Sequence, residues 1–99
     1  MRRSVFAPSF DREVEDIGVY IELRFGEAAR RDFIESLRET CARIAEFPGI
    51  GRREHGYATT ALAFVFRMNW VFFSVTADEI RFLHIRDGRM EKAGQSFVE

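Results

Sequence analysis

Residues 61–86 read ALAFVFRMNWVFFSVTADEIRFLHIR, and this stretch decides the fold because it contains three strands in succession. The strands are expected near residues 61–66, 69–76 and 79–86. The connections Arg67-Met68 and Ala77-Asp78 are short enough to be hairpin turns. Three strands joined in this way predict a mainly antiparallel sheet.

The central strand is apolar on both sides. Successive side chains on a strand point to opposite faces, so Trp70 and Phe72 share one face. Val71, Phe73 and Val75 share the other face. An antiparallel sheet with one wet face would be polar at every second position. The sequence therefore predicts that both faces of this sheet are covered.

The last strand repeats this pattern with arginines mixed in. Ile80 and Phe82 are expected to point to one face, and Leu83 and Ile85 to the other. By the same alternation, His84 shares a face with Ile80 and Phe82. A soluble monomer rarely leaves a large apolar patch bare. We therefore expect a docking surface, rimmed by arginines, on the face away from any helices, and a chain that is poorly soluble alone.

A short strand and a first helix precede the sheet. Ser4-Val5-Phe6-Ala7 is β-prone, and Pro8 ends the strand because it cannot donate to a ladder. Ser9 is the expected N-cap of a helix over about residues 9–24. The helix has an apolar stripe at spacings of three and four, formed by Phe10, Val14, Ile17, Ile21 and Phe25.

A second helix follows at once. Gly26 is the expected stop of the first helix, and the second begins near Glu27. Its apolar side consists of Ala29, Phe33, Leu37, Cys41 and Ile44. The short connection makes the pair an antiparallel helical hairpin. Pro48-Gly49-Ile50-Gly51 ends the second helix, and residues 52–56 are expected to form an exposed polar loop.

The order strand, helix, helix, strand, strand, strand predicts an α+β fold, β-α-α-β-β-β, with the hairpin packed on one face of a small, mainly antiparallel sheet. Residues 1–99 are expected to form a single domain, because 99 residues with 46% hydrophobic content suffice for one core and not for two. About residues 87–99 are expected to form a flexible tail.

Composition excludes several classes of function. The formal charge of −1 gives no general attraction to nucleic acid. The single cysteine, Cys41, excludes an internal disulfide and leaves no zinc-ligand cluster, and its place on the apolar stripe predicts a buried, inert thiol. No run of about 18 apolar residues is present to span a membrane. We expect a cytoplasmic protein with no membrane association, no metal and no cofactor.

The order and spacing of many residues resemble the ParE branch of the RelE/ParE toxin superfamily. The shared features begin with a proline before the first helix and an Ile-x-x-Tyr-Ile inside it. A glycine between the helices and a Pro-x-x-Gly after them follow. The matching residues are Pro8, Ile17, Tyr20-Ile21, Gly26, Ala29, Phe33, Leu37, Ile44, Pro48 and Gly51. Downstream, residues 70–73 (WVFF) resemble the aromatic strand, and residues 82–89 (FLHIRDGR) resemble the last strand and its Gly-Arg exit.

This resemblance, which covers nearly the whole chain, implies the toxin of a type II toxin–antitoxin system. Such a toxin is neutralised by a small antitoxin that wraps around it, so a toxin–antitoxin hetero-oligomer is expected. ParE-type members are linked to inhibition of DNA gyrase, without catalysis. RelE-type members are endoribonucleases that cut messenger RNA on the ribosome. The fold alone does not choose between the two activities.

The resemblance also gives candidate site residues. In a gyrase inhibitor, Arg81, Arg86 and Arg89 would contact the target. In a nuclease, catalysis would fall to His84 with Arg67, Arg86 and Arg89, because cleavage needs a proton acceptor and cations around the phosphorane. His84 is equally open to interpretation as a structural histidine, and Tyr20 is expected in the core with a hydrogen-bonded hydroxyl. No catalytic residue is assigned.

The candidate antitoxin contacts lie on and beside the strands: Trp70, Phe72, Phe82 and Arg67. Two positions depart from the family. Asp87 stands where ParE-like chains often have a histidine, and His84 where they commonly have an arginine. Both changes lower the local positive charge, so an attenuated toxin is a further alternative. A non-catalytic interaction module, its second sheet face buried in a homodimer, is another.

Overall fold

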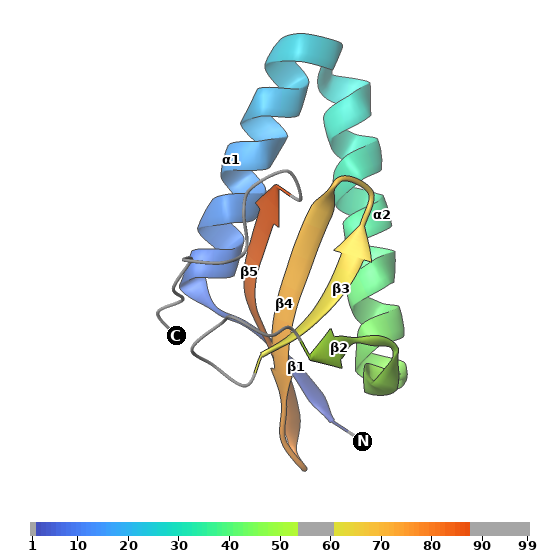
Figure 1. The fold of residues 1–99 in the computed structure, drawn as a ribbon. Coiled ribbons are helices and arrows are strands. Elements are labelled where there is room, and N and C mark those ends of the chain that lie inside the picture. Colours follow the sequence, from blue (N-terminus) through green and yellow to red (C-terminus); the bar gives the residue numbers. More distant parts are fainter. Residues whose placement is uncertain (1, 54–60, 88–99) are drawn as a thin grey trace.

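The computed structural model describes residues 2–53 and 61–87, which form two helices packed on one face of a mixed sheet (Figure 1). The elements are β1 (Arg3–Phe6), α1 (Pro8–Phe25), α2 (Glu27–Glu46), the 3-10 turn η1 (Pro48–Ile50), β2 (Arg52–Arg53), β3 (Leu62–Phe66), β4 (Asn69–Val75) and β5 (Glu79–Asp87). The predicted α+β architecture and the helical hairpin are therefore confirmed.

The five strands lie in the order β1-β5-β4-β3-β2. β1 pairs with β5 in parallel, and the other pairs are antiparallel. One prediction was wrong: Arg52 and Arg53 form β2, which pairs with Ala63 and Leu62 of β3, and are not part of a loop. The rest of that expected loop lies outside the described residues, as do residues 88–99 of the expected tail. Asp87 itself ends β5.

Helix α1 begins one residue earlier than expected. Pro8 occupies the first turn, where its fixed φ suits a helix and its missing N–H has no partner to lose. Ala7 is the N-cap, and Ser9 was wrongly predicted for that role. The Ser9 hydroxyl instead donates to the Leu83 carbonyl at 2.8 Å. Gly26, at φ +98°, separates α1 from α2 as predicted.

The two helices are joined by a cluster of charges around Arg30 of α2. Its guanidinium donates to Glu22 and Glu15 of α1, each at 2.8 Å. These hydrogen bonds raise the pKa of Arg30 above its ordinary value. Gly18 of α1 makes the approach possible, because a Cβ there would lie 2.9 Å from Nε of Arg30. The glycine thus allows the arginine to lie across the first helix.

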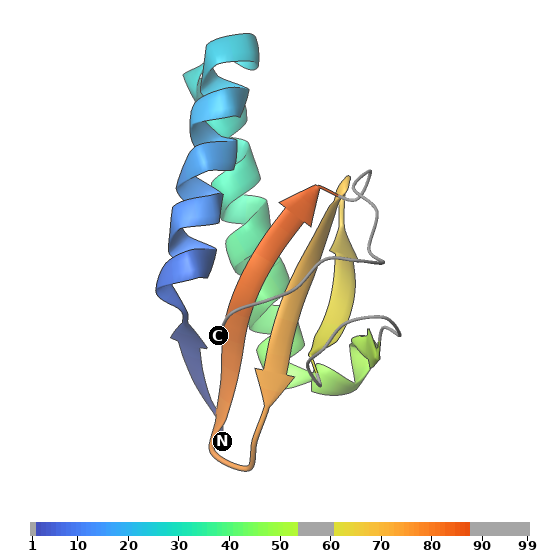
Figure 2. The ribbon, with the colours of Figure 1, turned by 60° about the vertical axis from the view of Figure 1, so that its left-hand side comes forward.

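The main core lies between the hairpin and the sheet, which Figure 2 shows from the side. Its buried members are Phe10, Phe33, Leu37, Cys41, Ile44, Phe66, Val71, Phe73, Ile80, Phe82 and Ile85. Most of the two predicted helical stripes are among these residues or pack against them. The exceptions are Ala29 and Phe25, and Phe25 has 71% of its surface exposed. It lies at the tip of the hairpin, which projects beyond the strands (Figure 1).

Burial makes Cys41 unreactive, as the sequence predicts. The thiol is buried in α2, and burial raises its pKa to about 12. Only the thiolate is nucleophilic, so at pH 8 we expect almost no reaction with Ellman's reagent in the native protein. One thiol per chain should react at once in denaturant. Rapid labelling of the folded chain would contradict this placement.

Gly51, the last residue of the predicted Pro-x-x-Gly, receives the ring of Phe73 against its α-carbon. A Cβ at this position would overlap the tip of that ring. Phe73 is fully buried, so the ring has no room to move away. We expect Gly51→Ala to lower the free energy of unfolding by about 1 to 3 kcal/mol, measured by urea denaturation.

Gly49→Ala provides the matched control for this substitution, because nothing lies within 4 Å of a Cβ added there. The two alanine variants should therefore differ clearly in their denaturation midpoints. Equal midpoints would mean that Phe73 does not pack on Gly51.

A β-bulge in β5 changes which residues share a face. Phe72 pairs with His84 and Phe73 with Phe82, so Leu83 is the extra residue. Partners directly opposite each other lie on the same face. His84 is therefore on the face of Phe72, and Ile85 returns to the main core with Ile80 and Phe82. The faces predicted for His84 and Ile85 were wrong because simple alternation assumes an unbroken ladder.

The second face of the sheet is not the bare surface expected from the sequence. Ala61, Ala63, Phe72 and Leu83 form a second buried cluster there, and Trp70 packs against it half-buried. The two alanines carry so little side chain that this cluster is small. Large exposed apolar side chains instead include several on α1 and on the β3–β4 turn, namely Val19, Tyr20, Leu23, Phe25 and Met68. The expected poor solubility of the isolated chain stays a prediction, with these residues as its basis.

Candidate functional site

Two of the three arginines predicted to contact a target, Arg81 and Arg86, do not come together. Arg81 lies near the start of β5 and Arg86 near its end. At about 3.3 Å per residue, the two positions are at most about 16 Å apart along the strand. Arg89 lies outside the described residues.

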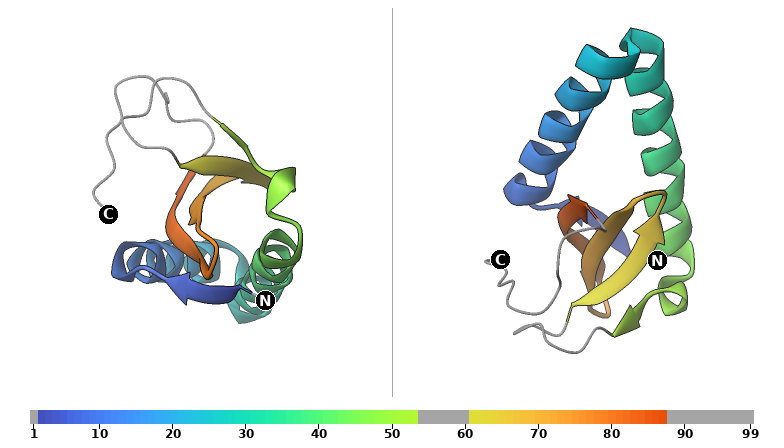
Figure 3. Two further views of the ribbon diagram at one scale, coloured as in Figure 1. Left: turned by 90° about the horizontal axis from the view of Figure 1, so that it is seen from below. Right: turned by 45° about the horizontal axis from the view of Figure 1, so that its top comes forward.

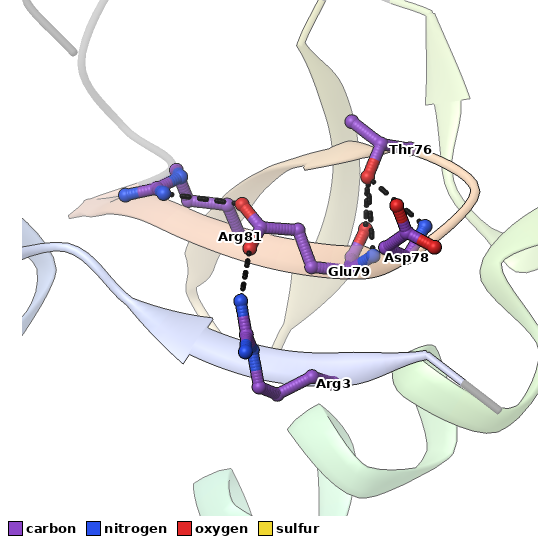
Figure 4. A network of polar contacts seen from close by, with 5 residues as sticks. All are labelled: Arg3, Thr76, Asp78, Glu79 and Arg81. Carbon is purple, nitrogen blue, oxygen red and sulfur yellow. Dashed lines mark hydrogen bonds and ion pairs between the residues drawn. The ribbon is translucent and has the colours of Figure 1, made fainter.

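Arg81 belongs to a polar network at the β4–β5 turn (Figure 4). Glu79 accepts from Arg3 at 3.3 Å and from Arg81 at 3.1 Å. These arginines hold the pKa of Glu79 below its ordinary value, the hydrogen bond from Arg3 being the largest cause. The Thr76 hydroxyl accepts from the backbone N–H groups of Asp78 and Glu79 and closes the turn. Arg81 therefore has a local structural role.

Glu13 of α1 joins His84 and Arg86 at the other end of β5. Both carboxylate oxygens lie 3.2 Å from Nδ1 of His84, and Oε2 lies 2.9 Å from Nε of Arg86. Nη2 of Arg86 lies 3.2 Å from the same Nδ1, so this nitrogen faces both a carboxylate, which can only accept, and a guanidinium, which can only donate. The His84 side chain is only 5% exposed. Its structural interpretation therefore describes the geometry better than a role as general base.

The same glutamate also completes the edge of the sheet. β1 pairs with β5 only as far as Phe82, so beyond that point no other strand of the described residues pairs with β5 on that side. The Ser9 hydroxyl donates a hydrogen bond to the Leu83 carbonyl, and the Glu13 carboxylate accepts one from the Ile85 N–H at 3.0 Å. Ser9 and Glu13 are one helical turn apart. Two side chains of α1 thus continue the hydrogen bonding that β1 leaves unfinished.

A groove of about 670 Å³ opens between the projecting hairpin and the end of the sheet at the β3–β4 turn. The right-hand view of Figure 3 shows the two helices rising beyond the ends of the strands to the tip of the hairpin. The lining of the groove is largely apolar and also contains charged side chains: Glu13, Asp16, Ile17, Tyr20, Ile21, Phe25, Ala29, Asp32, Phe33, Arg67, Met68, Asn69, Ile85 and Asp87.

Tyr20 of α1 lies at the groove and not in the core. The sequence places it near the apolar stripe, and we expected it in the core. The structure leaves it 52% exposed at the groove, so that prediction was wrong. Its ring also lies beneath the guanidinium of Arg24, 5.0 Å from the centroid.

Arg67 forms one wall of the groove from the β3–β4 turn. It has φ +56°, a conformation that non-glycine residues rarely adopt. Its Nη2 donates to Asp32 at 3.1 Å and to Ser36 at 2.8 Å, both on α2. Its guanidinium also lies 5.3 Å from the Phe66 ring centroid. These contacts hold an unfavourable backbone conformation in place and tie the turn to the helix.

The four residues predicted to bind an antitoxin do not share one surface. Phe82 is fully buried in the main core, and Phe72 is buried in the cluster on the opposite face. Trp70 is half-buried over that second cluster. Arg67 lines the groove on the helix side. Of the four, Arg67 is the one placed at the groove.

The sequence reasoning missed Glu13 and Asp16. A signal for them exists, because Glu13, Asp16, Ile17 and Tyr20 recur at spacings of three and four along α1. That pattern is a mixed acidic and apolar stripe beside the purely apolar one. It differs from a solvated face because large apolar side chains interrupt the charges.

Two further searches cover the described part of the chain. Within residues 2–53 and 61–87, no three histidine, cysteine or acidic side chains are grouped so as to hold a metal ion. No helix of that part is long and apolar enough to cross a membrane.

Comparison with known proteins gives two findings. The family model for the ParE toxin of the type II toxin–antitoxin system parDE matches residues 5–92. A solved structure of the chromosomal ParDE toxin–antitoxin system from P. aeruginosa superposes with a TM-score of 0.77 at 14% identity, covering 88% of this chain and 96% of that one. This structural likeness concerns the fold. Among curated proteins, none matches the sequence.

Proposed function

The chain belongs to the ParE toxin family of type II toxin–antitoxin systems, and we propose that it inhibits DNA gyrase by binding and is neutralised by a cognate antitoxin. Both partners would be met in the cytoplasm, and the resting state would be a toxin–antitoxin hetero-oligomer. The described residues that bear on this proposal are those around Glu13 and those of the groove.

The contact of Glu13 with His84 is the observation that carries the proposal of binding without catalysis. A ribonuclease needs a base that can reach the 2′-hydroxyl of its substrate. His84 is the strongest candidate base among the described residues, and its ring is buried and held by a carboxylate. Arg86, the nearest cation, is paired with that same carboxylate. This arrangement favours the non-catalytic ParE type of action over the RelE type.

The groove supports the proposal of a peptide-like partner. Tyr20, Phe25 and Met68 present exposed apolar surface beside it. Grooves of this kind accept the apolar face of a helix, with residues about one turn apart as anchors. An antitoxin segment laid there would cover side chains that the toxin alone leaves in water.

Inducible expression in bacteria tests the proposal. Expression of the chain alone should arrest growth, and co-expression with the small protein encoded beside its gene should restore growth and yield a stable complex. An attenuated toxin would give the complex without arrest, which would contradict the proposed gyrase inhibition. The absence of both arrest and complex would contradict the whole proposal.

The nuclease alternative is tested in the same cells. Messenger RNA should stay intact during growth arrest, and His84→Gln should not abolish toxicity while the fold persists. Messenger cleavage that disappears in the folded His84→Gln variant would establish the RelE type of action instead.

A further inference from the structure

Among the described residues, the groove lining has more carboxylates than cations, although the chain as a whole is close to neutral. This part of the lining contains four carboxylates, Glu13, Asp16, Asp32 and Asp87, and one guanidinium, that of Arg67. The formal charge of the lining is therefore −3. Counting also Arg86, which pairs with Glu13, and Arg24, which lies over the Tyr20 ring, it is −1. The docking surface rimmed by arginines that the sequence predicts was placed on the other face of the sheet, away from the helices, so it is a different surface from this groove.

The carboxylates differ in how far they are already neutralised. Asp32 pairs with Arg67, and Glu13 pairs with Arg86. Asp16 is exposed on α1, and no hydrogen bond or ion pair ties it to another residue of the described ranges. Asp16 and the exposed Tyr20 are one helical turn apart, so one negative charge and one aromatic surface are presented together.

We propose that the groove selects a basic amphipathic segment, with apolar residues that face Tyr20, Phe25 and Met68 and with arginine or lysine beside them. This inference rests on the proposed function, because the antitoxin is the partner that would supply the segment. It adds the charge of that segment, which is the feature that would separate a cognate from a non-cognate antitoxin. Complementary charge mainly sets specificity and association rate, and like charges disfavour the wrong partner.

The geometry favours a peptide over a compact ligand. The groove is open along the hairpin, and its exposed apolar residues come from separate elements, α1 and the β3–β4 turn. A helix laid along it would touch Phe25 near the hairpin tip and Met68 at the turn. Its flanking residues would then lie near Asp16 on α1 and Asp32 on α2. Two helices that each carry an aspartate toward one groove suit an occupant with basic residues on both flanks.

Two designed helical peptides of about 18 residues test the inference with the full-length chain. Both carry the same leucine and isoleucine stripe, and they differ only in having arginine or glutamate on the flanks. We expect the arginine peptide to bind at least fivefold more tightly at low salt. The difference should shrink as salt rises, because the groove is open to solvent and its charges are screened.

A charge reversal at Asp16 locates the effect. Asp16→Lys should lower the affinity for the arginine peptide and raise the affinity for the glutamate peptide, each by about two- to fivefold. The affinities of Asp16→Asn should lie between those of the wild type and those of Asp16→Lys. Glu39→Lys is the matched control, because Glu39 is an exposed α2 residue outside the groove lining. Its peptide affinities should follow those of the wild type apart from a small change common to both.

The inference is overturned if the glutamate peptide binds as well as the arginine peptide, or if Asp16→Lys and Glu39→Lys behave alike. It is also overturned if the isolated chain forms a dimer that Asp16→Lys dissociates, because the occupant is then a second copy. The peptide measurements require neither toxicity nor an antitoxin. If the peptides show no charge preference but the chain still arrests growth, the proposed function stands and this inference is wrong. If the arginine peptide is preferred but the chain does not arrest growth, this inference stands and the proposed function is wrong.

Discussion

Phe82→Ala is expected to lower the free energy of unfolding by about 3 to 5 kcal/mol, the range for removing a buried phenylalanine. The Phe82 ring is fully buried. It stacks on Phe6 at a centroid distance of 5.0 Å and contacts Phe10 and Phe73 at 5.8 and 6.2 Å. Such ring pairs contribute beyond their buried area. Urea denaturation followed by circular dichroism would give the change.

Phe25→Ala provides the matched control for Phe82→Ala, because the same side chain is removed from the exposed tip of the hairpin. Its effect on stability should stay within about 0.5 kcal/mol, as for most surface substitutions. The comparison matters for function, since the sequence proposed Phe82 as an antitoxin contact. Loss of antitoxin binding by Phe82→Ala would then follow from unfolding. Equal stability of the two variants would contradict the placement of Phe82 in the core.

Glu13→Ala is expected to cost about 3 kcal/mol, because one carboxylate serves three groups on β5. Its removal takes the acceptor from the Ile85 N–H and separates α1 from His84 and Arg86. Glu13→Gln keeps a carbonyl oxygen for the Ile85 amide, so its effect should be smaller. Urea denaturation of both variants and of the surface control Glu39→Ala measures these losses of unfolding free energy. The loss should be largest for Glu13→Ala, smaller for Glu13→Gln and smallest for Glu39→Ala.

Hydrogen exchange separates the two contributions of Glu13. In Glu13→Ala the Ile85 amide should exchange markedly faster than in the wild type, because it loses the acceptor that Glu13 supplies where the pairing of β5 with β1 has ended. In Glu13→Gln it should stay protected. Unchanged protection of Ile85 in Glu13→Ala would mean that the carboxylate does not complete the sheet edge.

The arrangement of helices and strands could be predicted from the sequence because it depends on local periodicity. The stripe from Phe10 to Ile21 and the stop at Gly26 are local signals, and both were correct. Alternation along β4 also placed Phe72 and Phe73 on the correct faces. In each case the physical cause lies within a few residues of the side chain concerned.

The errors share a different origin. The bulge at Leu83 inserts one residue into a ladder, and alternation along a single strand carries no sign of it. β2 exists because Arg52 and Arg53 find partners on β3, a pairing that their side chains do not signal. Both errors concern the relation between strands, which periodicity along one strand does not contain.

The candidate site was the least predictable part. Glu13 reaches Ile85, 72 positions further along the chain, because α1 passes beside the unpaired end of β5. The acidic groove likewise combines α1, α2 and the β3–β4 turn. Its charge could not be read from the overall balance of −1, because the arginines and carboxylates are unevenly distributed in space.

A gyrase supercoiling assay with the purified chain tests whether this ParE-family toxin acts by binding DNA gyrase and not by cutting RNA. Relaxed plasmid, gyrase and ATP would be incubated with the toxin, and translating ribosomes with a defined messenger would be treated in parallel. We expect that supercoiling is inhibited, that the protein encoded beside the toxin relieves the inhibition, and that the messenger stays intact. Undisturbed supercoiling together with a cleaved messenger would contradict this expectation.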